Sequence, residues 1–281
     1  MSGESVMRIA SPLPVGKSRP AVCAGRFYPA NPADLRLEVQ GLIAGAKVVE
    51  EPAPKAIVAP HAGYAYSGPV AASAHSRFRP ARDIIRRVIL LGPSHYASLS
   101  GIATSSADAF FTPLGRVPLD REAIAGVASL PQVMVLDEAH EPEHCLEVQL
   151  PFLQMILPQF TLVPLLVGDA PDEDIAEALA ALWDGPETRV VVSSDLSHYH
   201  AYAQANNLDR TTAEIIEALR SEQLDGDRAC GFRPIRGLLH LARRYRLNAR
   251  CIDLRNSGDT AGGGDRVVGY GAFIVVESQT T

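Results

Sequence analysis

Short runs of apolar residues recur along the chain and predict buried β-strands. The runs are rich in Val, Ile and Leu and do not alternate with polar residues, a pattern typical of strands that are covered on both faces of a parallel sheet. We expect central strands at 55–60, 87–92, 160–167 and 188–194, and two further strands at 250–255 and 267–277.

Segments with the apolar spacing of helices separate these runs. The predicted helices span 67–78, 120–130, 143–157, 171–183, 204–220 and 234–245. This alternation predicts an α/β fold: a single layered domain in which helices flank a mostly parallel sheet. Residues 1–20 are polar and contain proline, so we expect a flexible N-terminal arm ahead of an α/β domain at 21–281.

Composition excludes several classes of partner. The chain has 281 residues, of which 47% are hydrophobic, and a formal net charge of −6, which disfavours nucleic acid. No apolar stretch approaches the ~18 residues of a membrane span. The four cysteines are far apart in the chain and form no C-x-x-C pair, as is typical of a reducing cytoplasm. We therefore expect a cytoplasmic protein with neither nucleic acid nor membrane as its partner.

Three of the predicted strands are followed within a few residues by a histidine. These histidines are His61, His95 and His198. Ligands of open α/β sheets bind just outside the carboxyl ends of the strands, so parallel pairing would bring the three imidazoles to one edge. A single such histidine is more often an ordinary loop residue than a ligand, but the repetition favours a shared site, and imidazole is a common metal ligand.

Cys230 lies in a turn-like stretch directly before the predicted helix at 234–245. The amino end of a helix stabilises a thiolate, so this setting predicts a lowered thiol pKa and a metal-binding or nucleophilic cysteine. From this setting alone, a small buried hydrophobic residue is the commoner role of a free cysteine.

His144 and Glu147 are three residues apart at the start of the predicted helix at 143–157. That spacing places their side chains on one face, where both could line a pocket. Glu147 is equally well placed as a first-turn acid that interacts with the helix dipole.

At these same residues the chain resembles the MEMO family, known in bacteria as AmmeMemoRadiSam system protein B. The resemblance covers nearly the whole chain and keeps the order of the motifs. The matching motifs lie at 24–29 (AGRFYP), 60–64 (PHAGY), 92–95 (GPSH), 112–115 (TPLG), 143–144 (EH), 146–151 (LEVQLP), 193–195 (SSD) with His198, 230–231 (CG), 256–259 (NSGD) and 268–273 (VGYGAF).

The resemblance implies a fold similar to that of LigB-type class III extradiol dioxygenases. Those enzymes hold their metal with two histidines and a carboxylate, and the MEMO family has a cysteine in place of the carboxylate. His61, His95 and Cys230 are the metal ligands by this resemblance. Asp195 and His198 are the catalytic pair, in which His198 matches the acid/base histidine and Asp195 orients it.

The same resemblance places His144 in the pocket, and the chain departs from the family at two positions beside the motifs. Tyr96 stands where many members have a histidine, and Cys145 stands where a serine is usual. Neither is one of the three expected ligands. Cys145 leaves open a second thiol that serves as an alternative ligand or as a disulfide partner of Cys230.

Two imidazoles and a thiolate suit iron, copper or zinc better than magnesium or calcium. The resemblance implies a redox reaction of iron or copper with dioxygen or a small molecule, with zinc as the alternative metal. Two other functions stay open. One is a zinc-dependent hydrolase, and the other is an adaptor that binds a peptide or small molecule without turnover in a pocket that includes Tyr64 and Tyr96.

Overall fold

The computed structural model describes residues 17–47 and 49–277. In this part of the chain the main sheet has nine strands, in the order β10-β12-β2-β9-β3-β8-β4-β7, and β11 pairs with β12 outside this path. The centre of the sheet is parallel, as the apolar runs predict. It consists of β2 (Ala56–Ala59), β9 (Thr188–Ser193), β3 (Arg87–Pro93) and β8 (Thr161–Val167).

The sides of the sheet add antiparallel pairs, so the sheet as a whole is mixed. β12 (Val267–Glu277) is antiparallel to β2, to β11 (Leu247–Asn256) and to β10 (His198–His200). On the other side, β4 (Ile102–Thr104) is antiparallel to β8 and parallel to β7 (Val133–Val135). β11 and β12 can pair directly because antiparallel strands need no crossover helix between them.

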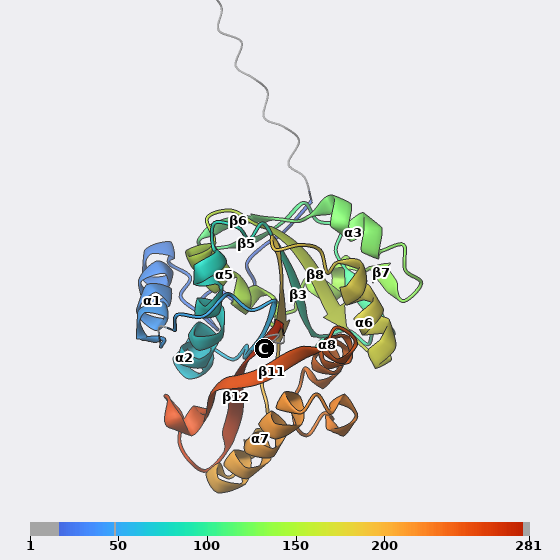
Figure 1. The fold of residues 1–281 in the computed structure, drawn as a ribbon. Coiled ribbons are helices and arrows are strands. Elements are labelled where there is room, and N and C mark those ends of the chain that lie inside the picture. Colours follow the sequence, from blue (N-terminus) through green and yellow to red (C-terminus); the bar gives the residue numbers. More distant parts are fainter. Residues whose placement is uncertain (1–16, 48, 278–281) are drawn as a thin grey trace, which may run out of the picture.

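Helices cover both faces of the sheet (Figure 1), which confirms the α/β class. Figure 1 shows α1, α2 and α5 gathered on one side, and α6 and α8 on the other. None of the helices in the described ranges is long and apolar enough to cross a membrane. The α-helices are α1 (Pro32–Gly45), α2 (Tyr64–His75), α3 (Arg121–Val127), α4 (Asp137–His140), α5 (Leu150–Ile156), α6 (Asp172–Ala181), α7 (Tyr202–Glu217) and α8 (Phe232–Arg244).

Short 3-10 helices and a small second sheet complete the domain. The second sheet has the order β1-β5-β6, from β1 (Ser18–Arg19), β5 (Ala109–Thr112) and β6 (Gly115–Pro118). The 3-10 helices are η1 (Ser76–Ala81), η2 (Glu147–Gln149), η3 (Ser221–Gln223) and η4 (Ser257–Asp259).

The helix predicted at 143–157 begins later than expected, with η2 and then α5. The preceding residues stay irregular because the Glu143 carboxylate accepts the backbone N–H groups of His95 and Cys145. A side chain that binds nearby backbone amides competes with helix formation. This irregular segment is what presents Glu143 and His144 to the site.

Two N-terminal features differ from the prediction. Residues 1–16 of the expected arm lie outside the described residues, but Ser18–Arg19 form β1 and Arg19 is only 5% exposed. The domain therefore begins before residue 21. Helix α1 was not predicted, although Leu35, Val39, Leu42 and Ile43 have helical spacing and Asn31 caps its start.

Candidate metal centre

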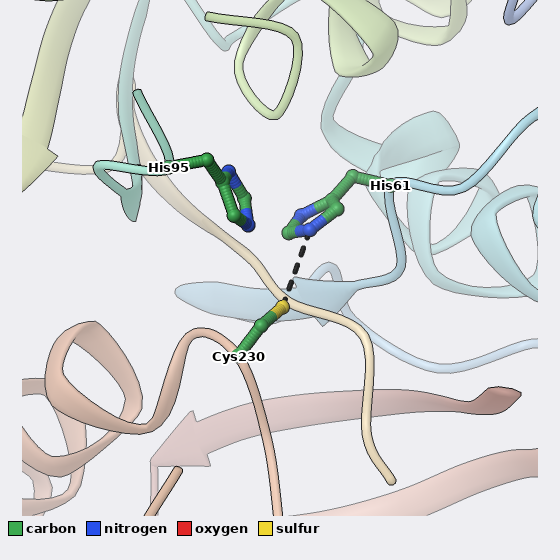
Figure 2. A group of neighbouring side chains, drawn as sticks. All are labelled: His61, His95 and Cys230. Atoms are coloured by element: carbon green, nitrogen blue, oxygen red, sulfur yellow. Dashed lines mark hydrogen bonds between the residues drawn. The ribbon is translucent and has the colours of Figure 1, made fainter. Parts of the chain in front are cut away.

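Two histidines and a cysteine from distant parts of the chain meet at the carboxyl edge of the sheet (Figure 2). His61 follows β2, His95 follows β3, and Cys230 precedes α8. A nitrogen of each imidazole and the thiol sulfur all lie within 4.8 Å of one another. The structure thus brings together the three residues expected to be ligands, at the sheet edge where the ends of β2 and β3 place the two histidines.

The His61 imidazole is held so that one nitrogen faces Cys230. His61 Nδ1 lies 2.9 Å from Ser193 Oγ. Ser193 donates its single hydroxyl proton to the Cys145 carbonyl at 2.6 Å, so it accepts from His61 and Nδ1 carries the hydrogen. His61 Nε2 therefore presents a lone pair, 3.3 Å from Cys230 Sγ.

A buried chain of neutral groups extends behind Ser193. The Gln149 side-chain amide donates to Ser193 Oγ at 2.8 Å and to the Pro60 carbonyl at 2.9 Å. Its oxygen accepts from His75 Nε2 at 2.7 Å. Burial lowers the pKa of His75 to about 4, so this imidazole is neutral at pH 7. The His61 imidazole is therefore supported by groups without formal charge.

His95 is supported by a carboxylate instead. Its Nδ1 donates to Glu143 Oε1 at 2.9 Å, and its backbone N–H donates to Glu143 Oε2 at 2.7 Å. A carboxylate only accepts, so Nδ1 carries the hydrogen and Nε2 is the free ligand atom. A metal-binding histidine is commonly oriented by a carboxylate in this way.

Burial and the neighbouring imidazoles keep the His61 imidazole neutral. Burial lowers the pKa of His61 well below its usual value, and the neighbouring imidazoles His95 and His144 lower it further. Burial alone would raise the pKa of the Glu143 carboxyl, but the imidazoles of His144 and His95 outweigh it and hold this pKa well below its usual range. Glu143 is thus ionised, and the His61 imidazole keeps a free lone pair.

Cys230 does not behave as its position before a helix predicts. Burial, followed by the charge of Asp195, raises the pKa of this thiol to about 12. The helix amino end is outweighed because the sulfur is taken out of water. The neutral thiol faces the His61 Nε2 lone pair, and a bound cation would take the place of that proton, since metals bind the thiolate.

Close packing fixes the cysteine against the end of β9. The N–H of Gly231 donates to Ser194 Oγ at 2.9 Å. A Cβ at position 231 would lie 2.6 Å from the Ser194 Cβ, so only glycine permits this approach. The turn therefore sets the position of Cys230 beside β9.

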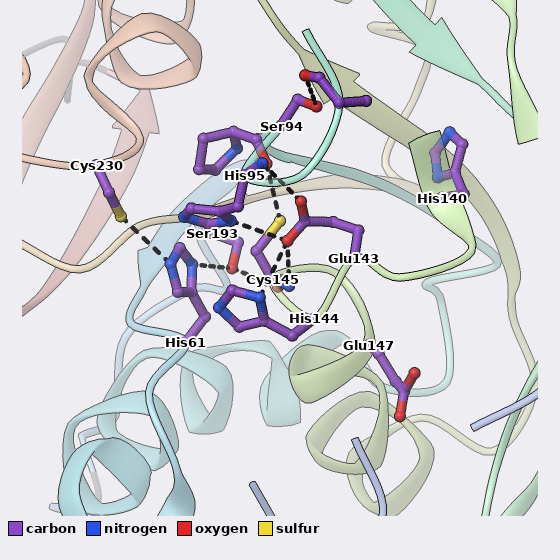
Figure 3. A network of polar contacts seen from close by, with 12 residues as sticks. His61, Ser94, His95, His140, Glu143, His144, Cys145, Glu147, Ser193 and Cys230 are labelled. Carbon is purple, nitrogen blue, oxygen red and sulfur yellow. Dashed lines mark hydrogen bonds and ion pairs between the residues drawn. The ribbon is translucent and has the colours of Figure 1, made fainter. Parts of the chain in front are cut away.

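His144 adds a third imidazole beside the two ligands (Figure 3). Its ring centroid is 4.7 Å from that of His95 and 5.3 Å from that of His61, and Phe27 packs near it at 4.8 Å. Its Nδ1 lies 3.2 Å from Glu143 Oε1 without the alignment of a hydrogen bond. His144 lies in the site, as predicted, and forms a second group of donor atoms with His95 and Glu143.

Asp195 and His198 have different relations to the three ligands. The buried Asp195 carboxylate accepts the backbone N–H of His61 at 2.7 Å, so it fixes a ligand and does not hold the His198 ring as predicted. Burial raises the pKa of Asp195. His198, in β10, is half-buried and close enough for its charge to lower the pKa values of His61 and Asp195. In the described residues neither belongs to a group of metal-donor atoms.

The family model described as "Memo-like protein" matches residues 19–274, which include every residue of the site. The chain belongs to the Memo family. Three MEMO1 family proteins are similar to it over most of their length. That of Methanosarcina barkeri is 34% identical over 92% of this chain and 99% of its own, that of Aquifex aeolicus is 34% identical over 91% and 97%, and that of Methanococcoides burtonii is 36% identical over 92% and 99%.

A solved structure is similar at a more distant level. The crystal structure of an uncharacterized Escherichia coli K12 protein covers 77% of the Memo-family chain and 98% of its own, with 12% identity and a TM-score of 0.46. The relation to LigB-type dioxygenases stays a prediction.

Two residues predicted to line the pocket lie elsewhere in this Memo-family chain. Glu147 begins η2 but points away from the histidines in Figure 3, and its carboxylate binds Arg19 at 2.6 Å. Tyr64 is 3% exposed, packs against Phe152, and donates its hydroxyl to the Val148 carbonyl. Glu147 is turned toward the N-terminal segment, and Tyr64 is turned into a core cluster that includes Leu35 and Phe152.

Tyr96 and Cys145 take opposite positions at the site. Tyr96 is 57% exposed and its ring lies 5.9 Å from that of His144, so it forms part of the rim. Cys145 is fully buried, and its thiol donates to the Pro93 carbonyl at 3.3 Å. Cys145 belongs to neither group of donor atoms among the described residues, and its sulfur is not a disulfide partner of Cys230.

Three residues that hold the ligands were not identified from the sequence: Glu143, Ser193 and Gln149. They act across separations of 48, 132 and 44 residues along the chain. All three belong to motifs of the family resemblance, at 143–144, 146–151 and 193–195, but nothing in the spacing of these motifs says which imidazole each residue supports.

Proposed function

We propose that this Memo-family protein is a metal-dependent oxidoreductase that binds iron or copper through His61, His95 and Cys230 and reacts with dioxygen. The observation that carries the proposal is that two imidazoles with free Nε2 lone pairs converge on one thiol sulfur. Two nitrogens and one sulfur are a borderline-soft donor set, which suits iron, copper or zinc and disfavours magnesium and calcium. Iron or copper, when bound, supplies one-electron exchange with dioxygen.

The chain's own groups divide the remaining tasks. Ser193 and Glu143 fix which nitrogen of each ligand imidazole is free. Cys230 releases its proton on binding a cation, so metal affinity should rise with pH. We assign proton transfer to His198, the half-buried imidazole on β10, and assign Asp195 to the position of the His61 backbone. A reducing compartment such as the cytoplasm would keep Cys230 as a thiol.

Metal binding tests the first part of the proposal. Protein purified without a histidine tag should contain iron or copper by elemental analysis, and the metal-free protein should bind Fe(II) under anaerobic conditions. His61→Ala and Cys230→Ser should each weaken binding by more than the ~10–100-fold typical of residues that only support a ligand. Cys251→Ser is the matched control, because Cys251 is a free cysteine on β11 and belongs to neither donor group in the described residues.

The reaction with dioxygen is tested separately. Iron-loaded protein should consume dioxygen faster than the same iron in solution, and His198→Gln should slow this without releasing the metal. Equal iron affinity in Cys230→Ser and the parent would contradict the ligand assignment. Metal bound as expected but without dioxygen consumption would contradict the oxidoreductase and, if the metal is zinc, would favour hydrolysis.

A non-catalytic binding function has one observation in its favour, the exposed aromatic rim. Tyr96 is 57% exposed and Tyr199 is 69% exposed, and each lies beside a site histidine. Exposed aromatic residues are common in binding surfaces. Binding of a peptide or small molecule that is unchanged by a chelator would favour this function over metal chemistry.

A further inference from the structure

A cavity of about 250 Å³ adjoins the candidate metal centre, and Cys230 forms part of its wall. The cavity lies where β3 and β8 end, against the start of α8. Pro93 and Val167 close it from the two strands, and Phe232 closes it from the helix. A volume just below the ~300–1,000 Å³ of drug-sized sites admits a small molecule. Position and size thus suit a substrate of the neighbouring metal.

The wall of the cavity combines apolar side chains with polar groups, and it carries one positive and one negative charge, Arg233 and Asp169. Pro93, Leu99, Val167 and Phe232 supply apolar surface, and Arg233 is the only cation among the described residues that line it. The guanidinium lies 5.0 Å above the Phe232 ring, which fixes it beside the apolar wall. A guanidinium is well suited to bind a carboxylate through two parallel hydrogen bonds.

Arg233 forms an ion pair with Asp169, and a ligand carboxylate can take the place of Asp169 in that pair. Arg233 Nη2 lies 2.8 Å from Asp169 Oδ1, but the Asp169 side chain is 80% exposed and that of Arg233 is 38% exposed. Exposed ion pairs contribute little, so a ligand carboxylate can replace Asp169 without a large loss.

We propose that this cavity binds the substrate of the metal centre and that the substrate is a small monocarboxylate with a short apolar body, held by Arg233. This inference rests on the proposed function, because the bound molecule is a substrate only if the metal centre is catalytic. The apolar wall accommodates the body, the guanidinium holds the carboxylate, and the far end of the molecule lies at Cys230. Recognition of an anion by Arg233 does not itself require the metal.

Ligand-observed NMR on the full-length metal-free protein tests the site, with butyrate as the probe and butyramide as its neutral counterpart. Butyrate should bind and butyramide should bind much more weakly. Arg233→Gln should weaken butyrate binding about 10-fold or more, the loss expected for a charged hydrogen-bond partner. Asp169→Asn should tighten it a few-fold, because the competing carboxylate is removed. Arg243→Gln, on the same helix but outside this cavity, is the matched control.

A second variant decides whether butyrate enters the cavity. Ala97→Leu adds volume at the wall and leaves Arg233 in place, so it should abolish butyrate binding. If it does not, the anion binds Arg233 from outside and the inference is overturned. Equal binding of butyramide and butyrate, or no effect of Arg233→Gln, would overturn it as well.

The metal-loaded protein separates this inference from the proposed function. Butyrate should shift the absorption bands of the Cu(II)-loaded protein, and should do so less in Arg233→Gln. Butyrate that binds without any change in the copper spectrum would show that the cavity does not serve the metal. A protein that binds copper as expected but no butyrate contradicts the cavity alone, whereas one that binds butyrate but no metal contradicts the proposed function.

Discussion

Glu143 and Glu147 are buried carboxylates only four residues apart, yet they hold different parts of the molecule. Glu143 accepts two hydrogen bonds from His95 and one from Cys145 at the metal centre. Glu147 binds Arg19 and the Tyr28 hydroxyl on the opposite side of the segment. Both acids are saturated with donors, so burial and hydrogen bonding alone do not distinguish an acid that orients a ligand from one that stabilises the fold.

The two acids are linked through Arg19. Besides the ion pair with Glu147, the Arg19 guanidinium donates to the backbone carbonyls of His140 and Glu143. It thereby ties the N-terminal segment to the irregular stretch that carries Glu143. The Arg19–Glu147 ion pair, which stabilises the fold, therefore also supports the segment that positions Glu143. It does so from the side away from the site.

We expect the largest effect from Glu147→Gln. The change leaves the Arg19 guanidinium, 5% exposed, without its counter-ion, and breaking a buried pair in this way costs about 3–5 kcal/mol. Urea unfolding of the metal-free protein measures the loss. Glu222→Gln, which breaks the exposed pair with Arg243, should leave the midpoint unchanged. Equal stability of Glu147→Gln and the parent would show that the pair does not stabilise the fold.

Glu143→Gln should act mainly on metal affinity, whereas Glu147→Gln acts mainly on the stability of the fold. A glutamine cannot accept both His95 N–H groups as the carboxylate does, so the imidazole loses its orientation and part of its basicity. We expect Fe(II) affinity to fall about 10–100-fold, as for other residues that support a metal ligand. Anaerobic competition with a chelator measures it. If affinity falls in Glu147→Gln and stays unchanged in Glu143→Gln, the two roles have been assigned the wrong way round.

Ser193→Ala should have a smaller effect on the same affinity, about tenfold or less, at the low end for supporting residues. The hydroxyl fixes the His61 tautomer but carries no charge. Ser94→Ala is the control, since the Ser94 hydroxyl donates to the Ala97 carbonyl and not to a ligand. A loss larger than that of Glu143→Gln would mean that the neutral support of His61 matters more than the charged support of His95.

The smallest expected effect is a dependence of stability on pH from His140, at the start of the same segment. Burial lowers its pKa to about 4, so below its usual value of 6.5 the unfolded chain takes up a proton that the folded chain does not. Stability therefore falls as pH falls, by about 0.7 kcal/mol for this histidine between pH 7 and 6. Urea unfolding of the metal-free protein at both pH values should show a smaller difference in His140→Gln. If the difference in stability between the two pH values is the same in His140→Gln and the parent, His140 does not contribute to the pH dependence.

The sequence predicts the ligands better than their supports. Runs of Val, Ile and Leu identify β2, β3 and β9, and strand ends in a parallel sheet meet at one edge, so His61 and His95 follow from the pattern. Cys230 was predicted as a ligand from its position before α8 and from the family resemblance.

The roles of Glu143 and Glu147 could not be predicted in this way. Both depend on which way a short irregular segment turns, and that is set by contacts with residues such as Arg19, more than a hundred residues away in the chain. The thiol pKa of Cys230 was predicted in the wrong direction for a similar reason, because burial is a property of the folded surroundings.

X-ray absorption at the edge of the metal found in the untagged protein tests the central claim most directly. The protein should show one sulfur neighbour, at about 2.3 Å as for zinc thiolates, together with imidazole nitrogens, and the sulfur should be absent in Cys230→Ser. A tightly bound metal with no sulfur neighbour in the parent, or one whose sulfur persists in Cys230→Ser, would contradict a centre made by His61, His95 and Cys230.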